Sequence, residues 1–115
     1  MNIQTFFTVE EVDPASLSDS VVVVIDVVRA TTTMTEALAN GARAIFPTAS
    51  TEEAVRLAQS LGRDDTLLCG ERKAAKVDGF DLGNSPGEFT AAAVRGKRLV
   101  MSLSLIHISE PTRLC

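Results

Sequence analysis

The sequence predicts an α/β protein: a three-layer α/β/α arrangement with a largely parallel sheet, truncated so that only the first part of a domain is present. The first observation is that strand-like and helix-like patterns alternate with short links over residues 1–102, as they do in βαβ units. The second is that one strand-like run, Val21 to Ile25, is continuously apolar, which is typical of a parallel strand covered on both faces. With 115 residues, the chain is long enough for one domain with a core.

The predicted elements begin with a strand over Ile3 to Val9, because these residues are mostly β-branched or aromatic. Turn-forming residues at positions 13–20 lead into the apolar run, and a helix follows from Thr31 to Ala39. Asn40 and Gly41 supply the stop signal of this helix. Its predicted apolar face consists of Met34, Ala37 and Leu38.

A second strand–helix pair follows. The strand is predicted over residues 43–48. Ser50 and Glu53 have the spacing of a capping box and begin the helix, which Gly62 ends. The apolar stripe of this helix consists of Ala54, Leu57, Ala58 and Leu61.

Thr66 to Gly70 is predicted as a short buried strand, and a polar loop follows over residues 71–84. Ser85, Pro86 and Glu88 then supply positions N-cap, N1 and N3 of a third helix that runs to about residue 94. Residues 97–102 begin a further strand.

Composition excludes several classes of function. The net charge is −4, so electrostatics give no reason to expect nucleic acid or an anionic membrane as a partner. No apolar run approaches the length of a membrane span, and the N-terminal residues lack the basic region and cleavage site of a signal peptide. Cys69 and Cys115 form neither a CxxC pair nor a disulfide framework, which fits a cytoplasmic protein. His107 has no His or Cys neighbours at metal-ligand spacing.

The last residues differ from the rest of the chain. Leu103 to Arg113 reads LSLIHISEPTR and resembles the translation of a transposase adaptor used to prepare sequencing libraries. We therefore expect domain sequence over residues 1–102 and a non-native tail over residues 103–115, with a genuine C-terminal segment as the alternative. On this interpretation His107 and Cys115 have no functional role.

Three polar segments follow predicted strands or lead into the third helix: DVVRATTT after Ile25, CGERK after Leu68, and GFDLGNSP. In open parallel sheets, ligands bind outside the carboxyl ends of the strands. Carboxylates at such an edge suit Mg²⁺, and arginines and hydroxyls at a helix N-terminus suit an oxyanion. The candidate residues are Asp26, Arg29, Thr31, Thr32, Thr33, Glu71, Arg72, Lys73, Asp81, Asn84 and Ser85.

Each candidate also has a purely structural interpretation. Asp26 and the three threonines could cap the following helix, and Arg29 could pair with Asp26. Residues 71–73 could be a run of solvated charges. Residues 84–86 are explained as the start of a helix, and Cys69 is explained as a small core residue. The shared placement of the polar segments at one sheet edge favours a ligand site.

Familiar nucleotide and hydrolase motifs are absent, since the sequence contains no GxxxxGK[ST], GxGxxG or GxSxG pattern. The predicted strand that ends in Asp26 is similar to that of the aspartyl-phosphate phosphatases, in which DxD follows a buried strand. Val28 stands in the place of the second acid, so this likeness fails at the position that matters.

Three motifs together, IDVVRATTT, GER and GFDLGNSP, resemble in order and spacing the N-terminal half of the 2-phosphosulfolactate phosphatase family. The resemblance covers nearly all of residues 1–102. It implies a layered α/β/α fold and Mg²⁺-dependent hydrolysis of the phosphate monoester of 2-phospho-3-sulfolactate to sulfolactate and phosphate, a step in coenzyme M biosynthesis. The partner would be a small anionic phosphoester, and homo-oligomerisation of the full-length parent stays open.

With this resemblance, we expect catalytic roles for Asp26 and Glu71, and we assign the same two residues and Asp81 to Mg²⁺. Whether Asp26 is a nucleophile or only a metal ligand stays open. The residues expected to bind substrate are Arg29, Thr31, Thr32, Thr33, Arg72, Asn84 and Ser85.

Family members continue for about as long again, so we expect the chain as written to be an inactive fragment whose sheet lacks partner strands. Three alternatives stay open. The substrate could be a related phosphoester, the domain could be a non-catalytic module that binds a sulfonate or phosphate metabolite, or the polar rim could serve only to cap helices.

Overall fold

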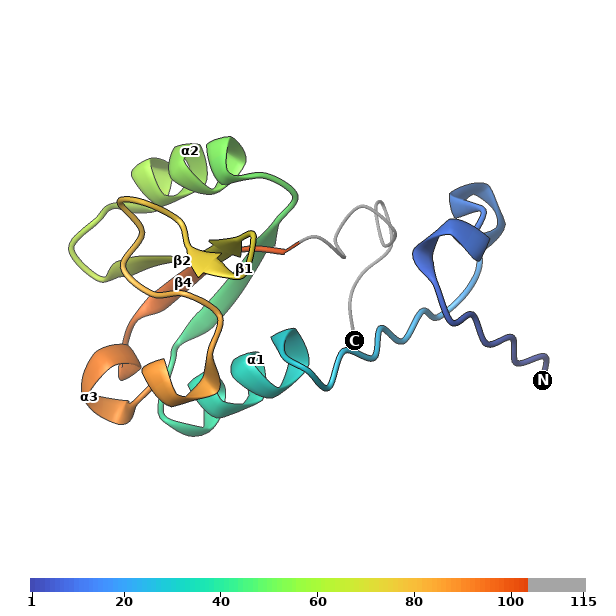
Figure 1. The fold of residues 1–115 in the computed structure, drawn as a ribbon, viewed down its shortest axis with the longest axis horizontal. Helices are drawn as coiled ribbons and strands as arrows, with labels where there is room; N and C mark the ends of the chain where they lie inside the picture. Colours follow the sequence, from blue (N-terminus) through green and yellow to red (C-terminus); the bar gives the residue numbers. More distant parts are fainter. Residues whose placement is uncertain (104–115) are drawn as a thin grey trace. The chain divides into compact units, whose positions relative to one another are not determined.

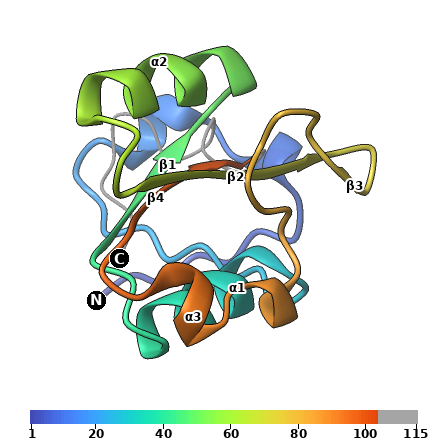
Figure 2. The same cartoon turned by 90° about the vertical axis from the view of Figure 1, so that its left-hand side faces the viewer.

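The computed structural model describes residues 1–103, of which residues 1–24 and residues 25–103 form separate units. The second unit contains a four-stranded sheet of order β1-β4-β2-β3 (Figure 1). Helix α2 covers one face of this sheet, and α1 and α3 cover the other (Figure 2). The predicted three-layer α/β/α fold is therefore confirmed. The strands are β1 (Ala44–Thr48), β2 (Thr66–Arg72), β3 (Ala75–Lys76) and β4 (Arg98–Ser102). The helices are α1 (Ala30–Ala39), α2 (Thr51–Leu61) and α3 (Ala91–Val94).

Strand β4 lies at the centre of the sheet and runs parallel to both of its neighbours, with Leu99 opposite Ile45 in β1 and Leu67 in β2. The fourth strand, β3, pairs antiparallel with the end of β2. The two residues between them, Lys73 and Ala74, have φ angles of 52° and 62°, as in a type I′ hairpin turn. The segment predicted as a polar loop over residues 71–84 therefore begins with a short hairpin.

The core forms on both faces of the sheet, because successive residues of a strand point to opposite sides. In β4, Val100 joins the cluster under α2, and its neighbours Leu99 and Met101 join the cluster under α1 and α3. All three side chains are fully buried. The cluster under α2 also contains Ala54, Ala58, Leu68 and Phe80, and the cluster on the other face contains Ala30, Ala37, Cys69, Phe89, Val94 and Leu103.

The predicted beginning and end of α2 are confirmed. The Ser50 hydroxyl accepts a hydrogen bond from the Glu53 N–H at 3.1 Å, and Gly62 follows the last helical residue with a φ of 90°. The Glu53 carboxylate accepts from the Ala49 N–H at 3.0 Å, one residue before the N-cap. In α1 one detail of the prediction is wrong, because Ala37 is buried but Leu38 is 53% exposed.

The predicted third helix is interrupted. It consists of a 3₁₀ turn, η3 (Pro86–Glu88), and the separate helix α3, whose N-cap Thr90 accepts from the Ala93 N–H at 3.3 Å. Between them, the fully buried Phe89 inserts into the core. The Phe89 carbonyl accepts from Asn40 Nδ2 at 2.8 Å. Phe89 is thus held by the core and by α1, which explains why one continuous helix does not form.

The apolar run Val21 to Ile25 does not form the predicted buried strand: Val21, Val23 and Ile25 are 83%, 66% and 78% exposed. A strand of this kind needs neighbours, and no described strand pairs with it. At one edge, β1 contains the exposed Pro47, which has no N–H for an added strand. The other edge of β2 is taken by β3 and by residues 81–82, which lie beside Cys69.

The predicted strand over Ile3 to Val9 is also wrong. The N-terminal unit contains two 3₁₀ turns instead, η1 (Val9–Glu11) and η2 (Pro14–Leu17). The Glu11 carboxylate accepts from the N–H groups of Phe7 and Thr8, at 2.8 and 3.2 Å, which favours a turn over an extended strand. The expected non-native tail lies outside the described residues except for Leu103. Within residues 1–103 no helix has the length and apolarity that a membrane crossing would need.

Candidate functional site

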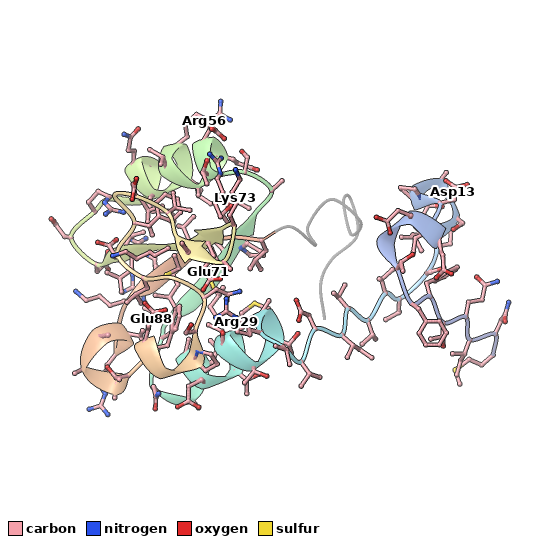
Figure 3. The ribbon with its side chains drawn as sticks, in the orientation of Figure 1. Asp13, Arg29, Arg56, Glu71, Lys73 and Glu88 are labelled. Atoms are coloured by element: carbon pink, nitrogen blue, oxygen red, sulfur yellow. The ribbon has the colours of Figure 1, made fainter. Side chains whose placement is uncertain are left out.

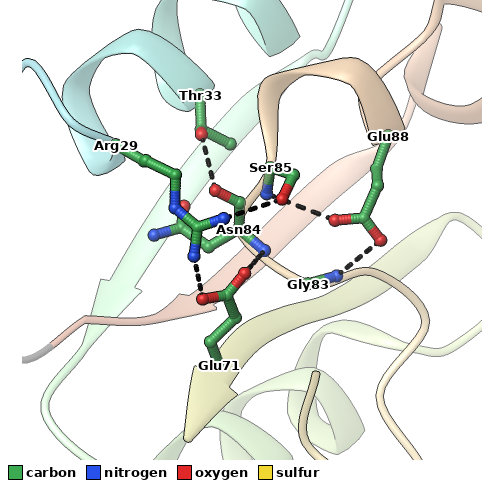
Figure 4. A network of polar contacts seen from close by, with 7 residues as sticks. All are labelled: Arg29, Thr33, Glu71, Gly83, Asn84, Ser85 and Glu88. Carbon is green, nitrogen blue, oxygen red and sulfur yellow. Dashed lines mark hydrogen bonds and ion pairs between the residues drawn. The ribbon is translucent and has the colours of Figure 1, made fainter. Parts of the chain in front are cut away.

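A polar network joins the start of α1, the end of β2 and the turn before η3. Arg29 is the N-cap residue of α1, and its side chain and that of Glu71 in β2 point toward each other (Figure 3). One guanidinium nitrogen, Nη2, forms an ion pair with Glu71 Oε2, and the other, Nη1, donates to Ser85 Oγ at 2.8 Å. The second Glu71 oxygen, Oε1, accepts from the Asn84 backbone N–H at 3.2 Å (Figure 4).

Strand geometry separates two residues that the sequence analysis grouped together. Glu71 and Arg72 are neighbours in β2, so their side chains point to opposite faces of the sheet. Glu71 faces the layer of α1, whereas Arg72 donates to Thr51 Oγ1, at the start of α2, at 3.3 Å. The structure therefore brings Arg29, Glu71, Asn84 and Ser85 together and leaves Arg72 outside their network.

Three successive backbone N–H groups of the turn at residues 83–85 bond to carboxylates. The N–H groups of Gly83 and Ser85 donate to the two oxygens of Glu88, and the intervening N–H of Asn84 donates to Glu71, each at 3.2 Å. A Cβ atom on Gly83 would lie 2.9 Å from Glu88 Oε2, so a side chain there would displace the carboxylate from these bonds. The Thr33 hydroxyl completes the network by donating to the Asn84 carbonyl at 3.0 Å.

The sequence analysis missed the role of Glu88 in this turn. It assigned Glu88 to the helix cap alone, and the bond from the Ser85 N–H is that capping bond. The same carboxylate also accepts from Gly83, two residues earlier. Two signals in the sequence could have revealed this role: the capping spacing from Ser85 to Glu88, and a glycine, Gly83, two residues before the cap.

The three threonines have different partners. Thr31 Oγ1 accepts from the Asp26 N–H at 3.3 Å, and Thr32 Oγ1 donates to the Val27 carbonyl at 2.6 Å. Thr33 is fully buried and reaches Asn84. Thr31 and Thr32 therefore fix the backbone of residues 26–32, and only Thr33 belongs to the polar network.

The three carboxylates expected to bind Mg²⁺ are not assembled. Asp81 Oδ2 accepts from the Leu68 N–H at 2.8 Å and pairs with Arg63 at 3.1 Å, while Glu71 pairs with Arg29. The half-buried Asp26 carboxylate makes no hydrogen bond or ion pair with another described residue. Over residues 1–103, no group of three or more His, Cys, Asp or Glu side chains could hold a metal ion. The described arrangement therefore does not by itself fit Mg²⁺.

The network can interact with an anion. The Arg29 side chain is 37% exposed and the Glu71 side chain 15%, so the guanidinium can be reached from solvent. Charged N–H donors of this kind bind oxyanions through short, strong hydrogen bonds.

Cys69 is the small core residue that the sequence analysis described. Its side chain is fully buried. Burial, together with the negative charges of Asp81 and Glu88, raises the pKa of the Cys69 thiol to about 12. A thiol with this pKa is not a nucleophile near neutral pH.

Fold and site together define a three-layer α/β protein with an arginine-centred polar network near the carboxyl end of a parallel strand. The chain belongs to the 2-phosphosulpholactate phosphatase family, whose sequence profile matches residues 6–104. The family resemblance seen in the sequence motifs is therefore confirmed.

Several curated relatives carry the name "Probable 2-phosphosulfolactate phosphatase". The relative from Caldanaerobacter subterraneus is 42% identical over 102 residues, which cover 89% of this chain and 42% of that protein. For a relative from Clostridium perfringens the identity is 46% over 105 residues, covering 89% and 42%. For one from Clostridium acetobutylicum it is 38% over 102 residues, covering 89% and 43%. The chain thus spans about two fifths of the length of these relatives.

Proposed function

We propose that this chain is part of a phosphatase that hydrolyses the phosphate monoester of 2-phospho-3-sulfolactate to sulfolactate and phosphate, with Mg²⁺, in coenzyme M biosynthesis in the cytoplasm. Family membership and the names of the relatives support this proposal. Because the chain spans about two fifths of those relatives, the activity is proposed for the whole protein. We expect the 115-residue chain alone to be inactive.

The observation that carries the proposal is the half-exposed Arg29 guanidinium, held in place by Ser85 and Glu71. The proposed substrate carries a phosphate, a carboxylate and a sulfonate on a small frame, so its recognition requires fixed cationic donors. A guanidinium binds such groups with two parallel N–H donors. A donor that is already oriented loses less conformational entropy on binding.

We assign the substrate anions to Arg29, Asn84 and Ser85, with support from Thr33 behind the turn and from Thr31 and Thr32 at the start of α1. Arg72 would contribute from the opposite face of β2, toward a different group of the substrate. The network and the face on which each side chain lies support these assignments.

Asp26 and Glu71 remain the proposed catalytic carboxylates. Asp26 lies three residues before the network residue Arg29. Its carboxylate makes no hydrogen bond or ion pair with another described residue, and a nucleophile, general base or metal ligand needs such a free carboxylate. Because Asp26, Glu71 and Asp81 do not converge, we propose that further Mg²⁺ ligands come from outside residues 1–103.

The test uses the full reading frame that contains this chain. Purified protein is assayed for phosphate release from 2-phosphosulfolactate, with Mg²⁺ and with a chelator, and against a panel of related phosphate monoesters. Asp26→Ala should lower kcat by about a hundredfold or more. Asp64→Ala, a change at an exposed carboxylate in the loop before β2, is the matched control and should keep full activity.

Two outcomes would contradict the proposal. Full turnover by Asp26→Ala would remove Asp26 from the chemistry. Binding of sulfolactate without release of phosphate from any ester of the panel would favour a non-catalytic binding module instead.

A further inference from the structure

We propose that Glu71 acts as an internal anion: in the free protein its carboxylate fills a seat formed by the Arg29 guanidinium and the Asn84 N–H, with the Ser85 hydroxyl holding the guanidinium, and a phosphate or sulfonate group displaces it. The proposal rests on the proposed function only for the identity of the displacing anion. The seat itself is given by the geometry of the network (Figure 4).

The first step concerns the donors. Glu71 receives one charged N–H from Arg29 and one backbone N–H from Asn84, each on a different oxygen. This combination of a guanidinium and a turn N–H is the one with which proteins bind tetrahedral oxyanions. A carboxylate presents two oxygens in a plane, much as two oxygens of a phosphate or sulfonate would be presented. Glu71 therefore occupies the position of a ligand group.

The second step concerns the ease of displacement. The Arg29 side chain is 37% exposed, so an incoming anion reaches the guanidinium from solvent. The Glu71 side chain is only 15% exposed, so the ion pair is partly screened by solvent, and both partners regain hydration when they separate. Glu71 lies next to the end of β2, and the following residues 72–76 are exposed, so its side chain has solvent to move into.

The third step shows that the seat persists when Glu71 leaves. Glu88 holds the N–H groups of Gly83 and Ser85, and Thr33 holds the Asn84 carbonyl. Only the middle N–H of the turn, that of Asn84, loses its partner when Glu71 moves. The two glutamates therefore have different roles: Glu88 is a positioning residue for the turn, and Glu71 competes with the ligand.

The experiment compares two chemically identical substitutions in the 115-residue chain. Inorganic phosphate is titrated at constant ionic strength, set with chloride, and binding is followed by the amide NMR signals of residues 83–85. Glu71→Gln should lower the Kd for phosphate by on the order of tenfold, because the competing charge is removed from a charge-assisted pair. Glu88→Gln should raise the Kd or abolish binding, because one of the two oxygens that hold the Gly83 and Ser85 N–H groups becomes an NH2 group, which cannot accept.

A second substitution at the same position keeps the test decisive if Glu71→Gln unfolds. Glu71→Asp retains the charge but shortens the side chain by one methylene, which draws the carboxylate away from both donors. It should give a smaller decrease in Kd than Glu71→Gln. Arg29→Ala, combined with either substitution at Glu71, should abolish the increase in affinity for phosphate.

The proposal is overturned if folded Glu71→Gln or Glu71→Asp binds phosphate no better than the unsubstituted chain, or if the gain survives Arg29→Ala. Its failure is separate from that of the phosphatase proposal. Tighter phosphate binding by Glu71→Gln together with no ester hydrolysis by the full-length protein would support the seat and reject the enzyme. Ester hydrolysis by the full-length protein, together with unchanged phosphate binding by Glu71→Gln, would support the enzyme and reject the seat.

Discussion

Arg29 and Glu71 lie 42 residues apart in the sequence and form an ion pair that joins the start of α1 to the end of β2. The pair is also the centre of a larger arrangement, since Arg29 reaches Ser85 and Glu71 reaches the Asn84 N–H. Three chain segments are thus fixed relative to one another by one guanidinium and one carboxylate. In the proposed function, the same groups that order the segments would also bind the anionic substrate.

Substitution of Arg29 should loosen this junction. Arg29→Ala removes both the ion pair and the bond to Ser85, and we expect the free energy of unfolding to fall by about 1 kcal/mol, a modest value because the side chain is 37% exposed. Urea unfolding followed by circular dichroism measures this change.

Arg43→Ala is the matched control. Arg43 also pairs with a carboxylate, that of Asp65 at 2.9 Å, but its side chain is 55% exposed, so its loss should cost less than about 0.5 kcal/mol. Equal destabilisation by the two substitutions would show that the network around Arg29 adds nothing beyond a surface ion pair.

Gly83 should not tolerate a side chain. In Gly83→Ala the new Cβ would lie 2.9 Å from Glu88 Oε2, so the carboxylate would move and weaken its bonds to the N–H groups of Gly83 and Ser85. We expect a loss of about 1–2 kcal/mol and faster hydrogen exchange at residues 83–85. Gly87→Ala, where a Cβ meets no atom within 4 Å, should change neither quantity, and a similar loss in both variants would contradict this explanation.

The hydroxyl of Ser50 should stabilise α2. It accepts from the Glu53 N–H at 3.1 Å, so Ser50→Ala should lower the free energy of unfolding by about 1 kcal/mol. Ser60→Ala changes an exposed position inside the same helix and should be neutral or slightly stabilising, because alanine has the higher helix propensity. Thermal unfolding of the two variants separates the cap from the helix interior, and an equal effect would argue against the cap.

The elements that the sequence predicted well are those whose signals are local. The cap, the apolar stripe and the terminal glycine of α2 all lie within one short segment, and the structure has each of them. The fold class follows from the alternation of such segments. Strand β4 was also predicted, over residues 97–102, although its central position depends on β1 and β2.

The failures concern non-local facts. Val21 to Ile25 has the composition of a buried strand, but burial requires neighbouring strands that no single segment encodes, and no described strand pairs with it. Phe89 interrupts the third helix because the core and Asn40, far away in sequence, hold it. In the candidate site, the sequence grouped Glu71 with Arg72, and strand alternation placed them on opposite faces.

The centre of the sheet should be the most sensitive place in the fold. Leu99 is fully buried in β4 against Phe89 and Val94 in the same cluster, so Leu99→Ala leaves a cavity and should cost about 2–5 kcal/mol. Leu38→Ala removes an equally large side chain that is 53% exposed and should cost far less. Equal midpoints of urea unfolding for these two variants would show that Leu99 contributes no more to the core than the exposed Leu38.

Cys69 makes stability depend on pH in the alkaline range. Burial raises the pKa of its thiol to about 12 in the folded protein, from an ordinary value of 9.0. The folded state therefore favours the protonated thiol: its contribution is complete below pH 9.0 and is lost as the pH rises toward about 12. In a Cys115→Ser background, the free energy of urea unfolding should fall between pH 9 and pH 11, and Cys69→Ala should show a smaller fall over the same range. The thiol should also react with iodoacetamide at pH 8 only after unfolding. Rapid labelling of the folded chain, or the same pH dependence in Cys69→Ala, would mean that the thiol is not buried as described.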